Sequence, residues 1–483
     1  MFLGIDIGTS AVKAVLVADG DVVAQSSAPL AISRPHALWS EQDPESWWLA
    51  TEVAVAALDP DLRAVVQGIG LAGQMHGATL LDRADWPLRP AILWNDGRAA
   101  AECAELETAE PRSRTITGNI AMAGFTAPKL LWLRRHEPEV FASTATVLLP
   151  KDYVRLRMTG YKASDMSDAS GTLWLDVQQR RWSPEMLAAT GLGENQMPRL
   201  YEGPGITGSL RPEIAQQWGM GQVPVAAGAG DNAAAAIGLG VANAGDAFLS
   251  LGTSGVLFVA TDRFRPNAEQ AVHAFAHALP GRWHQMSVML SAASCLDWAA
   301  ALLSLGGVEA LLALAEAGQS DGVIFLPYLS GERTPHGNPH AKGVLFGLTA
   351  STGPAAIARA VLEGVAMGLR DGLDALASAG SEVGTIWMAG GGSRSSVWNR
   401  IIASALERPL ALNAEGQVGP AFGAARLARL AVTGEPVEAV CIPPTRTGLV
   451  EPDPALSAQF AARLPIFRQL YRDLRPFFGA GSC

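Results

Sequence analysis

The sequence predicts an α/β protein built from two domains with a cleft between them. Three observations support this fold class. The chain has 483 residues, which is more than one ordinary hydrophobic core accommodates. Strand-like and helix-like segments alternate along it, as they do in α/β proteins. A glycine-containing motif near the beginning of the chain recurs just past its midpoint, which indicates two halves with one fold.

The first segments of the chain predict a meander of three strands, at residues 3–7, 12–17 and 22–27, each rich in residues that favour strands. A helix is predicted from Pro44, because an acidic residue precedes this proline and a proline suits the first helical position. A long helix is predicted from Pro354, where apolar residues follow at helical spacing.

The composition is that of a globular protein. Hydrophobic residues make up 49% and charged residues 17% of the chain, and the formal net charge is −10. This charge provides no overall field that would attract nucleic acid or an anionic membrane, so we expect neither as a partner. The apolar stretch 223–241 is interrupted by Asp231 and Asn232, so we expect no membrane-spanning helix.

The cysteines and the first residues indicate the compartment. The four cysteines are scattered and form no CxxC pair, which is typical of reduced thiols in a cytoplasm. They are Cys103, Cys295, Cys441 and Cys483. Asp6 places an acid where a signal peptide would be apolar, so we expect a cytoplasmic protein.

The repeated motif is a Gly-Thr-Ser turn between two apolar strands, in residues 4–10 and again in residues 249–255. Glycine lets the backbone approach a ligand, successive N–H groups form an anion-binding concavity, and the hydroxyls add neutral donors. An ordinary polar turn is the alternative for one copy, but two matched copies favour phosphate binding. We place the boundary between two domains, residues 1–240 and 241–483.

Two aspartates near the strand ends are the candidate catalytic and metal-binding groups. Asp6 lies on the strand that enters the first turn and can hold Mg²⁺ through water, because hard cations prefer oxygen ligands, or it can cap neighbouring N–H groups. Asp231 follows a strand-like segment, where open α/β sheets bind ligands. Asp231 also suits the N-cap of the alanine-rich helix that follows. A helix N-terminus favours its ionised form, which can accept a proton from a substrate hydroxyl.

Four other residues are candidates for substrate binding. Met75 and His76 stand between glycines after a strand-like segment, although a lone histidine is more often structural. Trp94 can stack on the flat face of a ligand, or it can belong to the core while Asp96 caps a helix. Asn232 follows Asp231 directly.

Three consecutive glycines at positions 390–392 separate a strand-like segment from a helix-like one. They let a flat ligand such as adenosine lie on bare backbone, whereas a plain turn does not need three. The predicted ATP-binding residues are Gly8, Thr9, Ser10, Lys13, Gly252, Thr253, Ser254, Gly391, Gly392 and Ser393.

Two other patterns point to different chemistry and are rejected. Residues 68–73 match the dinucleotide-binding pattern GxGxxG. That pattern must open a helix, and the residues after it favour a loop and a strand, which argues against an oxidoreductase. The histidines at positions 273, 277 and 284 lie in a stretch that alternates like a strand and lacks an acidic ligand, which disfavours a metal site. No GxxxxGK[ST] loop occurs in the sequence, which excludes the P-loop kinases.

Taken together, these motifs resemble the FGGY carbohydrate kinases, members of the actin, hexokinase and heat-shock ATPase superfamily. The resemblance runs from Gly4 to about Ala431. Residues 124–133 resemble the first family signature and residues 343–363 resemble the second. The second departs from the family pattern at Ala356, which we expect on a helix surface. The resemblance implies two actin-like (ribonuclease H-like) ATPase domains with a cleft between them.

Within the family, several segments are similar to those of members that act on D-xylulose. They are residues 33–43, 74–77, 93–98, 149–153 and 330–335. The resemblance implies phosphorylation of D-xylulose to D-xylulose 5-phosphate by ATP and Mg²⁺. It also implies that Met75 and His76 contact the sugar, that Asp231 accepts the proton and that Asp6 binds metal or phosphate. Asp231 is a second candidate metal ligand.

Three alternatives to this function remain at the level of sequence. The chain can be an FGGY kinase for a related ketopentose or polyol, a sugar-binding protein on a kinase scaffold, or an oxidoreductase. The oligomeric state stays open, with a homodimer among the alternatives.

Overall fold

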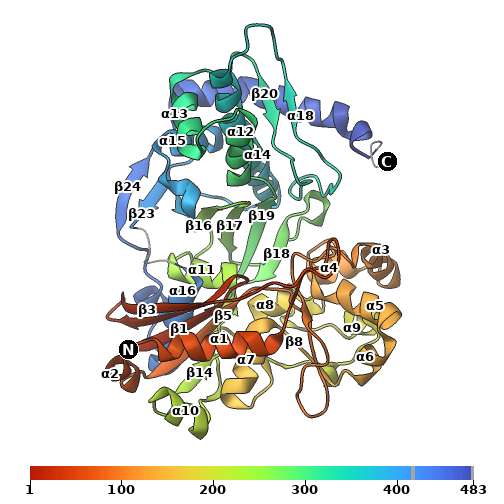
Figure 1. The fold of residues 1–483 in the computed structure, drawn as a ribbon, viewed down its shortest axis with the longest axis vertical. Helices are drawn as coiled ribbons and strands as arrows, with labels where there is room; N and C mark the ends of the chain where they lie inside the picture. The colour runs from red at the N-terminus through yellow and green to blue at the C-terminus, as the bar shows by residue number, and fades with distance from the viewer. Residues whose placement is uncertain (415–418, 480–483) are drawn as a thin grey trace.

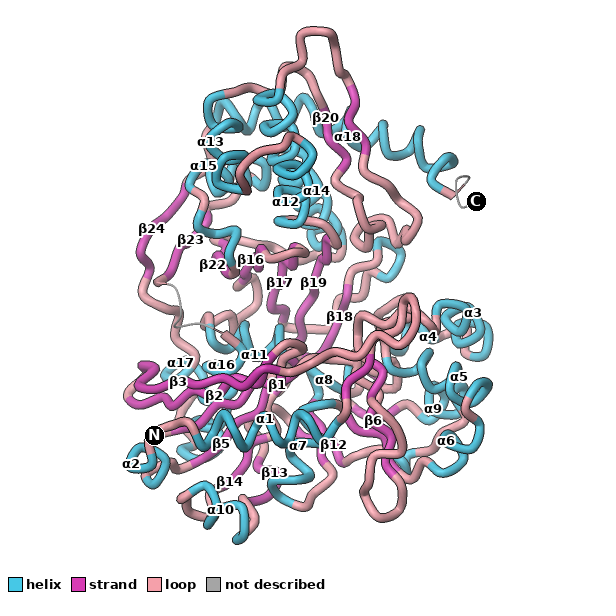
Figure 2. Tube along the Cα trace, in the orientation of Figure 1, coloured by secondary structure: helices cyan, strands magenta, loops and turns pink. Residues whose placement is uncertain are grey.

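The computed structural model describes residues 1–414 and 419–479, which form two sheets surrounded by helices (Figure 1). The first half of the chain makes the lower part of the molecule in Figure 1, and most of the second half makes the upper part. Figure 2 shows the strands of both sheets in magenta, with helices packed around them.

The first sheet has seven strands, with β15 paired to the end of β5. Its strands are β1 (Phe2–Ile7), β2 (Ala11–Ala18), β3 (Asp21–Pro29), β5 (Gly68–Gly73), β13 (Ile206–Ser209), β14 (Pro224–Ala226) and β15 (Ala229–Gly230). The main order is β13-β14-β5-β1-β2-β3. Strands β1, β2 and β3 are antiparallel, whereas β1, β5 and β14 are parallel.

The second sheet repeats this arrangement. Its strands are β16 (Ala247–Leu251), β17 (Gly255–Thr261), β18 (His273–Ala276), β19 (Trp283–Met289), β22 (Ile386–Ala389), β23 (Leu410–Asn413) and β24 (Arg446–Val450). The order is β18-β19-β17-β16-β22-β23-β24. Strands β16, β17 and β19 are antiparallel, and β16, β22 and β23 are parallel. The shared pattern of three antiparallel and then two parallel strands confirms the prediction of two halves with one fold.

The helices cover the faces of these sheets and fill the space around them. They are α1 (Pro44–Ala56), α2 (Pro60–Ala64), α3 (Ala100–Ala109), α4 (Ser113–Thr117), α5 (Thr126–His136), α6 (Pro138–Ser143), α7 (Pro150–Thr159), α8 (Met166–Ser170), α9 (Pro184–Thr190), α10 (Pro212–Trp218), α11 (Asp231–Gly238), α12 (Ala293–Leu302), α13 (Val308–Ala317), α14 (Pro354–Ser378), α15 (Ser396–Leu406), α16 (Pro420–Thr433), α17 (Val437–Val440) and α18 (Pro454–Phe478).

Short strands pair outside the two sheets. These pairs are β4 (Glu41–Gln42) with β7 (Ala91–Ile92), β6 (Thr79–Leu81) with β8 (Thr146–Leu148), β9 (Ala163–Asp165) with β12 (Arg199–Tyr201), β10 (Leu175–Asp176) with β11 (Arg181–Trp182), and β20 (Ile324–Leu326) with β21 (Val344–Phe346).

Most elements predicted from the sequence are present. Helices begin at Pro44 and at Pro354 as predicted, and the first three strands overlap the predicted meander. Residues 68–73 form strand β5 itself and do not open a helix, which confirms the rejection of the dinucleotide pattern. The expectation for Ala356 is wrong, because this residue of α14 is buried.

Helix α16 lies in the second half of the sequence but packs on the first sheet (Figure 1). A Cβ on Gly4 of β1 would lie 1.8 Å from the carbonyl oxygen of Ala421, and one on Gly423 would lie 1.7 Å from that of Ala234 in α11. Only glycine allows backbones to approach so closely. Helix α16 therefore contacts both the strand that carries Asp6 and the helix that begins at Asp231, a crossing that the predicted boundary near residue 240 does not include.

Within residues 1–414 and 419–479, no helix has the length and apolar character that a membrane crossing requires. Cys103, Cys295 and Cys441 are free thiols. Cys483 lies outside the described residues.

Candidate active site

The two candidate aspartates come together at one edge of the first sheet. Asp6 of β1 pairs in register with Ala72 of β5, and Ala72 pairs in turn with Ala229 of β15. Asp231 begins α11 directly after β15. Because these strands are parallel, their carboxyl ends meet at the same edge, which is where open α/β sheets bind ligands.

The electrostatics of the two carboxyls reflect this proximity. Burial and the negative charge of Asp231 together raise the pKa of Asp6 to about 7, against the opposing charge of Lys13. Burial also raises the pKa of Asp231 to about 6, against hydrogen bonds from Asn232 that lower it. Asp231 keeps part of its surface accessible to solvent. A charged ligand bound beside it can therefore change the protonation state of its carboxyl group.

The residues present fit a magnesium ion. Oδ1 of Asp6 is buried and has no hydrogen-bond partner among the described residues. Over residues 1–414 and 419–479, no group of three or more His, Cys, Asp or Glu side chains is arranged to hold a metal ion. Magnesium commonly uses only one or two carboxylates together with waters and substrate phosphates, so Asp6 and Asp231 provide a suitable donor set.

The position of Asp231 corrects one interpretation of the sequence. The N-cap of α11 is Gly230, and Asp231 is the first helical residue with no capping hydrogen bond from its side chain. Its Oδ1 instead accepts hydrogen bonds from the backbone N–H of Asn232 at 2.7 Å and from the Nδ2 of Asn232 at 3.0 Å. Asn232 therefore orients the carboxylate, and its contact with a substrate stays a prediction.

The first Gly-Thr-Ser turn is held by side chains from other elements. The hydroxyl of Thr9 donates to Oε1 of Gln74 at 3.0 Å, and Nε1 of Trp94 donates to that hydroxyl at 3.0 Å. Nε2 of Gln42 donates to the carbonyl oxygen of Thr9 at 2.7 Å. Sequence reasoning missed Gln42 and Gln74, although Gln74 directly precedes Met75.

Trp94 is not a core residue, because 46% of its surface is exposed. The alternative that Asp96 caps a helix is also wrong. Its carboxylate accepts a hydrogen bond from the backbone N–H of Ser40 at 2.6 Å and pairs with Arg98. Trp94 thus lies at the surface beside Thr9. Of the other residues predicted in this turn, Gly8 is half-buried, whereas Ser10 and Lys13 are exposed.

The second turn and the glycine run are brought together. Gly252 and Thr253 are exposed and Ser254 is half-buried, and the carbonyl oxygen of Thr253 accepts a hydrogen bond from the backbone of Ala292 at 2.9 Å. A Cβ on Gly392 would lie 2.7 Å from Cβ of Leu251, the residue before this turn. Gly391 and Ser393 belong to the single 3₁₀ turn (Gly391–Arg394) that follows β22. These predicted ATP-binding residues therefore share one edge of the second sheet.

Met75 and His76 lie beside the turn that leads into Asp231. A Cβ on Gly230 would lie 2.9 Å from Cγ of Met75. Nδ1 of His76 is 2.7 Å from the carbonyl oxygen of Gly171, which makes it the protonated ring nitrogen. Burial, with Lys129 nearby, lowers the pKa of His76 to about 3, so its ring is neutral at physiological pH.

Lys129 is a further residue that sequence reasoning missed. It is fully buried, and its Nζ donates to the carbonyl oxygens of His76 at 2.8 Å and Gly124 at 2.9 Å. It therefore fixes the backbone of the loop that carries His76. Its place in the segment 124–133, which resembles a family signature, was the signal that could have found it.

One hydrophobic cluster joins the site to the second sheet. It contains Met75, Ala236 of α11, Phe248 of β16 and Phe258 of β17. Figure 1 shows α11 between the two sheets. The helix that begins at Asp231 thus shares a hydrophobic cluster with the strands that flank the second Gly-Thr-Ser turn.

Comparison with protein families defines the class of protein. The N-terminal domain of the FGGY family of carbohydrate kinases matches residues 1–238, and the C-terminal domain of that family matches residues 247–432. The chain belongs to the FGGY family of carbohydrate kinases. The two repeated sheets agree with the actin-like ATPase architecture that the resemblance implied.

Individual proteins and solved structures are similar to the chain over nearly its whole length. The chain is 55% identical to a xylulose kinase of Escherichia coli (strain K12) over 482 residues, which covers 99% of each chain. It is also 55% identical to a xylulose kinase of Klebsiella pneumoniae over 481 residues, again 99% of each. The crystal structure of a xyloylose kinase from Brucella ovis superposes with a TM-score of 0.96 at 50% identity, covering 99% of both chains. A glycerol kinase from Plasmodium falciparum, at 20% identity and a TM-score of 0.89, covers 97% of each chain and shares the fold.

Proposed function

We propose that this chain transfers the γ-phosphoryl group of ATP to D-xylulose and forms D-xylulose 5-phosphate. The observation that carries the proposal is the placement of Asp231 beside Asp6 at the strand ends, next to Met75 and His76. The xylulose kinases of two bacteria, each 55% identical over 99% of the chain, support this sugar as the substrate.

In the proposed reaction, Asp231 is the general base. Its carboxylate accepts the proton of the 5-hydroxyl group as that oxygen bonds to the γ-phosphorus, and the bond from phosphorus to ADP breaks. Phosphoryl transfer depends mainly on positioning and on charge stabilisation. With a pKa of about 6, Asp231 is mostly ionised at neutral pH and matched to proton transfer there.

The two turns and the glycine run are the proposed ATP site. Backbone N–H groups and hydroxyls at Gly8–Ser10 and Gly252–Ser254 would bind phosphate oxygens, and Lys13 would add a positive charge. Adenosine would lie on the bare backbone of Gly391 and Gly392, next to Ser393. Asp6, with Asp231 beside it, would hold Mg²⁺, which when bound supplies positive charge to the phosphates.

The two domains have different roles in this proposal. Residues 1–240 would bind the sugar and the transferred phosphate, and residues 241–483 would bind ATP. Closure of the domains on both substrates would exclude water and limit hydrolysis of ATP. A cytoplasmic location and a homodimer stay predictions; light scattering of the purified protein measures the latter.

A panel of acceptors tests the proposed substrate. The purified protein is assayed for release of ADP with D-xylulose, D-ribulose, L-ribulose, xylitol and glycerol at saturating ATP and Mg²⁺. We expect D-xylulose to give the highest kcat/KM. A higher value for another acceptor would assign the enzyme to that sugar or polyol, and no ADP release with any acceptor would favour a sugar-binding protein.

A further inference from the structure

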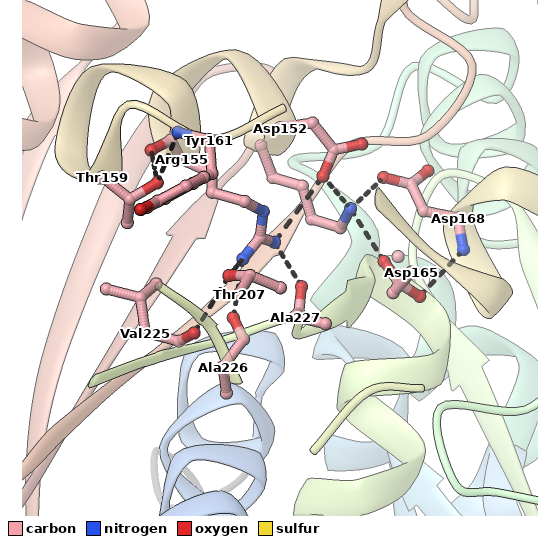
Figure 3. Close-up of polar contacts among 12 residues, drawn as sticks. Asp152, Arg155, Thr159, Tyr161, Asp165, Asp168, Thr207, Val225, Ala226 and Ala227 are labelled. Atoms are coloured by element: carbon pink, nitrogen blue, oxygen red, sulfur yellow. Dashed lines mark hydrogen bonds and ion pairs between the residues drawn. The ribbon is translucent and has the colours of Figure 1, made fainter. Parts of the chain in front are cut away.

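A cluster of charged side chains is buried behind the candidate active site. Nζ of Lys151 lies 2.6, 2.7 and 3.0 Å from carboxylate oxygens of Asp152, Asp165 and Asp168, and none of these four side chains is exposed to solvent. Arg155 is 3.6 Å from Asp152 and equally buried. Figure 3 shows the three carboxylates converging, with the guanidinium of Arg155 between Asp152 and the carbonyl oxygens of Ala226 and Ala227. These five residues are called the buried charge cluster below.

Stability alone does not explain this cluster. Removing charges from water is energetically costly, and apolar replacements of buried ion pairs are often neutral or stabilising. Burial also raises the pKa of Asp168 and so favours its protonated form. Protonation of this carboxyl brings the net charge of the cluster, two cations and three carboxyls, closer to zero. What such a cluster provides is fixed geometry for the groups bonded to it.

A chain of bonds runs from this cluster to the candidate base. The backbone N–H of Gly230 donates to Oγ of Ser167 at 3.1 Å, and the hydroxyl of Ser167 donates to Oδ1 of Asp165. The other oxygen of Asp165 forms the ion pair with Lys151. Gly230 is the N-cap of α11, directly before Asp231, so the chain ends one peptide bond from the carboxylate-bearing residue.

The same cluster holds the segment that leads to Gly230. The guanidinium of Arg155 donates to the carbonyl oxygens of Ala226, at 2.8 Å, and Ala227 (Figure 3). Gly228 follows with φ 77°, and a Cβ there would lie 1.8 Å from the carbonyl oxygen of Leu71 in β5. Residues 226–230 are therefore fixed at both ends and at the middle, which leaves little freedom in where α11 begins.

We propose that Ser167, backed by the buried charge cluster, is a positioning residue that sets the place of the Asp231 carboxylate through the backbone of Gly230. This inference rests on the proposed role of Asp231 as general base. Misplacement of a catalytic group by about 1 Å can cost on the order of 10²-fold in rate. Loss of the Ser167 hydroxyl leaves the N–H of Gly230 without its acceptor and lets the start of α11 shift.

The Ser167→Ala variant tests this proposal. We expect kcat with D-xylulose to fall about 10- to 100-fold, while the KM for the sugar changes by less than about 3-fold. The matched control is Ser404→Ala. Like the hydroxyl of Ser167, the buried hydroxyl of Ser404 accepts a backbone N–H, that of Asp453, at 3.0 Å; it donates to the carbonyl oxygen of Arg400 at 2.7 Å. Its variant should lose comparable thermal stability and keep the wild-type kcat.

A double-mutant cycle separates positioning from a general structural effect. In an Asp231→Asn background, Ser167→Ala should lower the residual kcat no further, because groups that act as a unit are not additive. If the two losses multiply, Ser167 acts independently of Asp231 and the proposal is overturned. Should Ser167→Ala fail to fold, Ser167→Cys replaces the hydroxyl with a weaker hydrogen-bonding thiol and should lower kcat in the same direction.

The outcomes distinguish this inference from the proposed function. If Asp231→Asn abolishes turnover but Ser167→Ala, or Ser167→Cys in its place, keeps the wild-type kcat, only the positioning role fails. If Asp231→Asn itself turns over at the wild-type rate, the assignment of the base fails and the positioning role fails with it.

Discussion

The two Gly-Thr-Ser turns occupy equivalent places in the two repeated sheets, yet their surroundings differ. The strand before the first turn carries Asp6, whereas the strand before the second carries Ser250 at the equivalent position. Side chains from distant elements bind Thr9 in the first turn. In the second turn, residues at the start of α12 bind the carbonyl oxygen of Thr253: Ala292 and Ser294 donate their backbone N–H groups, and Ser294 also donates its hydroxyl.

This difference indicates a division of labour within one repeated fold. The first half places two carboxyls at the strand ends, where proton and metal chemistry would occur. The second half presents exposed glycine and neutral hydroxyls next to a glycine run. A carboxylate beside bound phosphates would repel them, so a neutral turn suits the half that would hold the nucleotide.

Substitutions at the two equivalent positions, Asp6 and Ser250, should give the largest difference in kcat between the two halves. We expect Asp6→Asn to lower kcat on the order of 10²-fold, because it removes a charge that would stabilise the transfer through the metal. Ser250→Ala, its counterpart in the second half, should stay within about 3-fold of the wild type. Steady-state assays of ADP release measure both. Equal losses in the two variants would remove the proposed division of labour.

The glycine run offers a test of the second half. Nothing lies within 4 Å of a Cβ added to Gly391, so Gly391→Ala should fold normally. If adenosine lies on this backbone, the added methyl group should raise the KM for ATP about 10-fold, a loss of about 1.4 kcal/mol, and leave the KM for D-xylulose unchanged. Gly384→Ala, where an added Cβ also meets nothing within 4 Å, is the matched control at the other end of β22. An unchanged KM for ATP in Gly391→Ala would place the nucleotide elsewhere.

A smaller effect is expected at the first turn. Trp94→Phe keeps an aromatic ring but loses the N–H that donates to Thr9. Loss of one such bond is worth about 1 kcal/mol, so kcat/KM for ATP should fall about 5-fold. Trp86→Phe changes another exposed tryptophan outside the site and should have no effect. A wild-type value for Trp94→Phe would mean that Thr9 needs no such support.

The last expected effect is on stability, and its size depends on pH. The pKa of Asp6 rises from 3.8 to about 7 in the folded protein. Between these values the unfolded chain loses this proton while the folded chain keeps it, so stability decreases as pH rises through this window and stays reduced above pH 7. Without ligands, Asp6→Asn should therefore have a larger free energy of unfolding than the wild type at pH 8, by up to about 4 kcal/mol, and should lose this advantage near pH 4. Thermal denaturation at both values measures it; a less stable variant at pH 8 would show that the carboxylate is not strained by burial.

Much of the fold was predictable because its signals are local. Runs of apolar residues define β1 and β2, a proline begins α14, and the repeated Gly-Thr-Ser motif reports the duplication directly. The positions of Asp6 and Asp231 near strand ends were also predictable, and their roles stay predictions.

The missed features depend on contacts between distant segments. Gln42 reaches the first turn from another part of the chain, and α16 crosses from the second half to the first sheet. Asp231 was interpreted as an N-cap because its residue type suits that position, but Gly230 takes it. Spacing and propensity carry no information on these tertiary contacts.

The central claim is that Asp231 is the general base between two halves with different roles. It is tested most directly by the turnover and the sugar affinity of Asp231→Asn, measured on one preparation. Calorimetric titration gives the affinity for D-xylulose, and ADP release gives kcat. We expect the affinity to stay within about 3-fold of the wild type while kcat falls on the order of 10³-fold, the scale of a lost general base. A kcat close to that of the wild type would contradict the account.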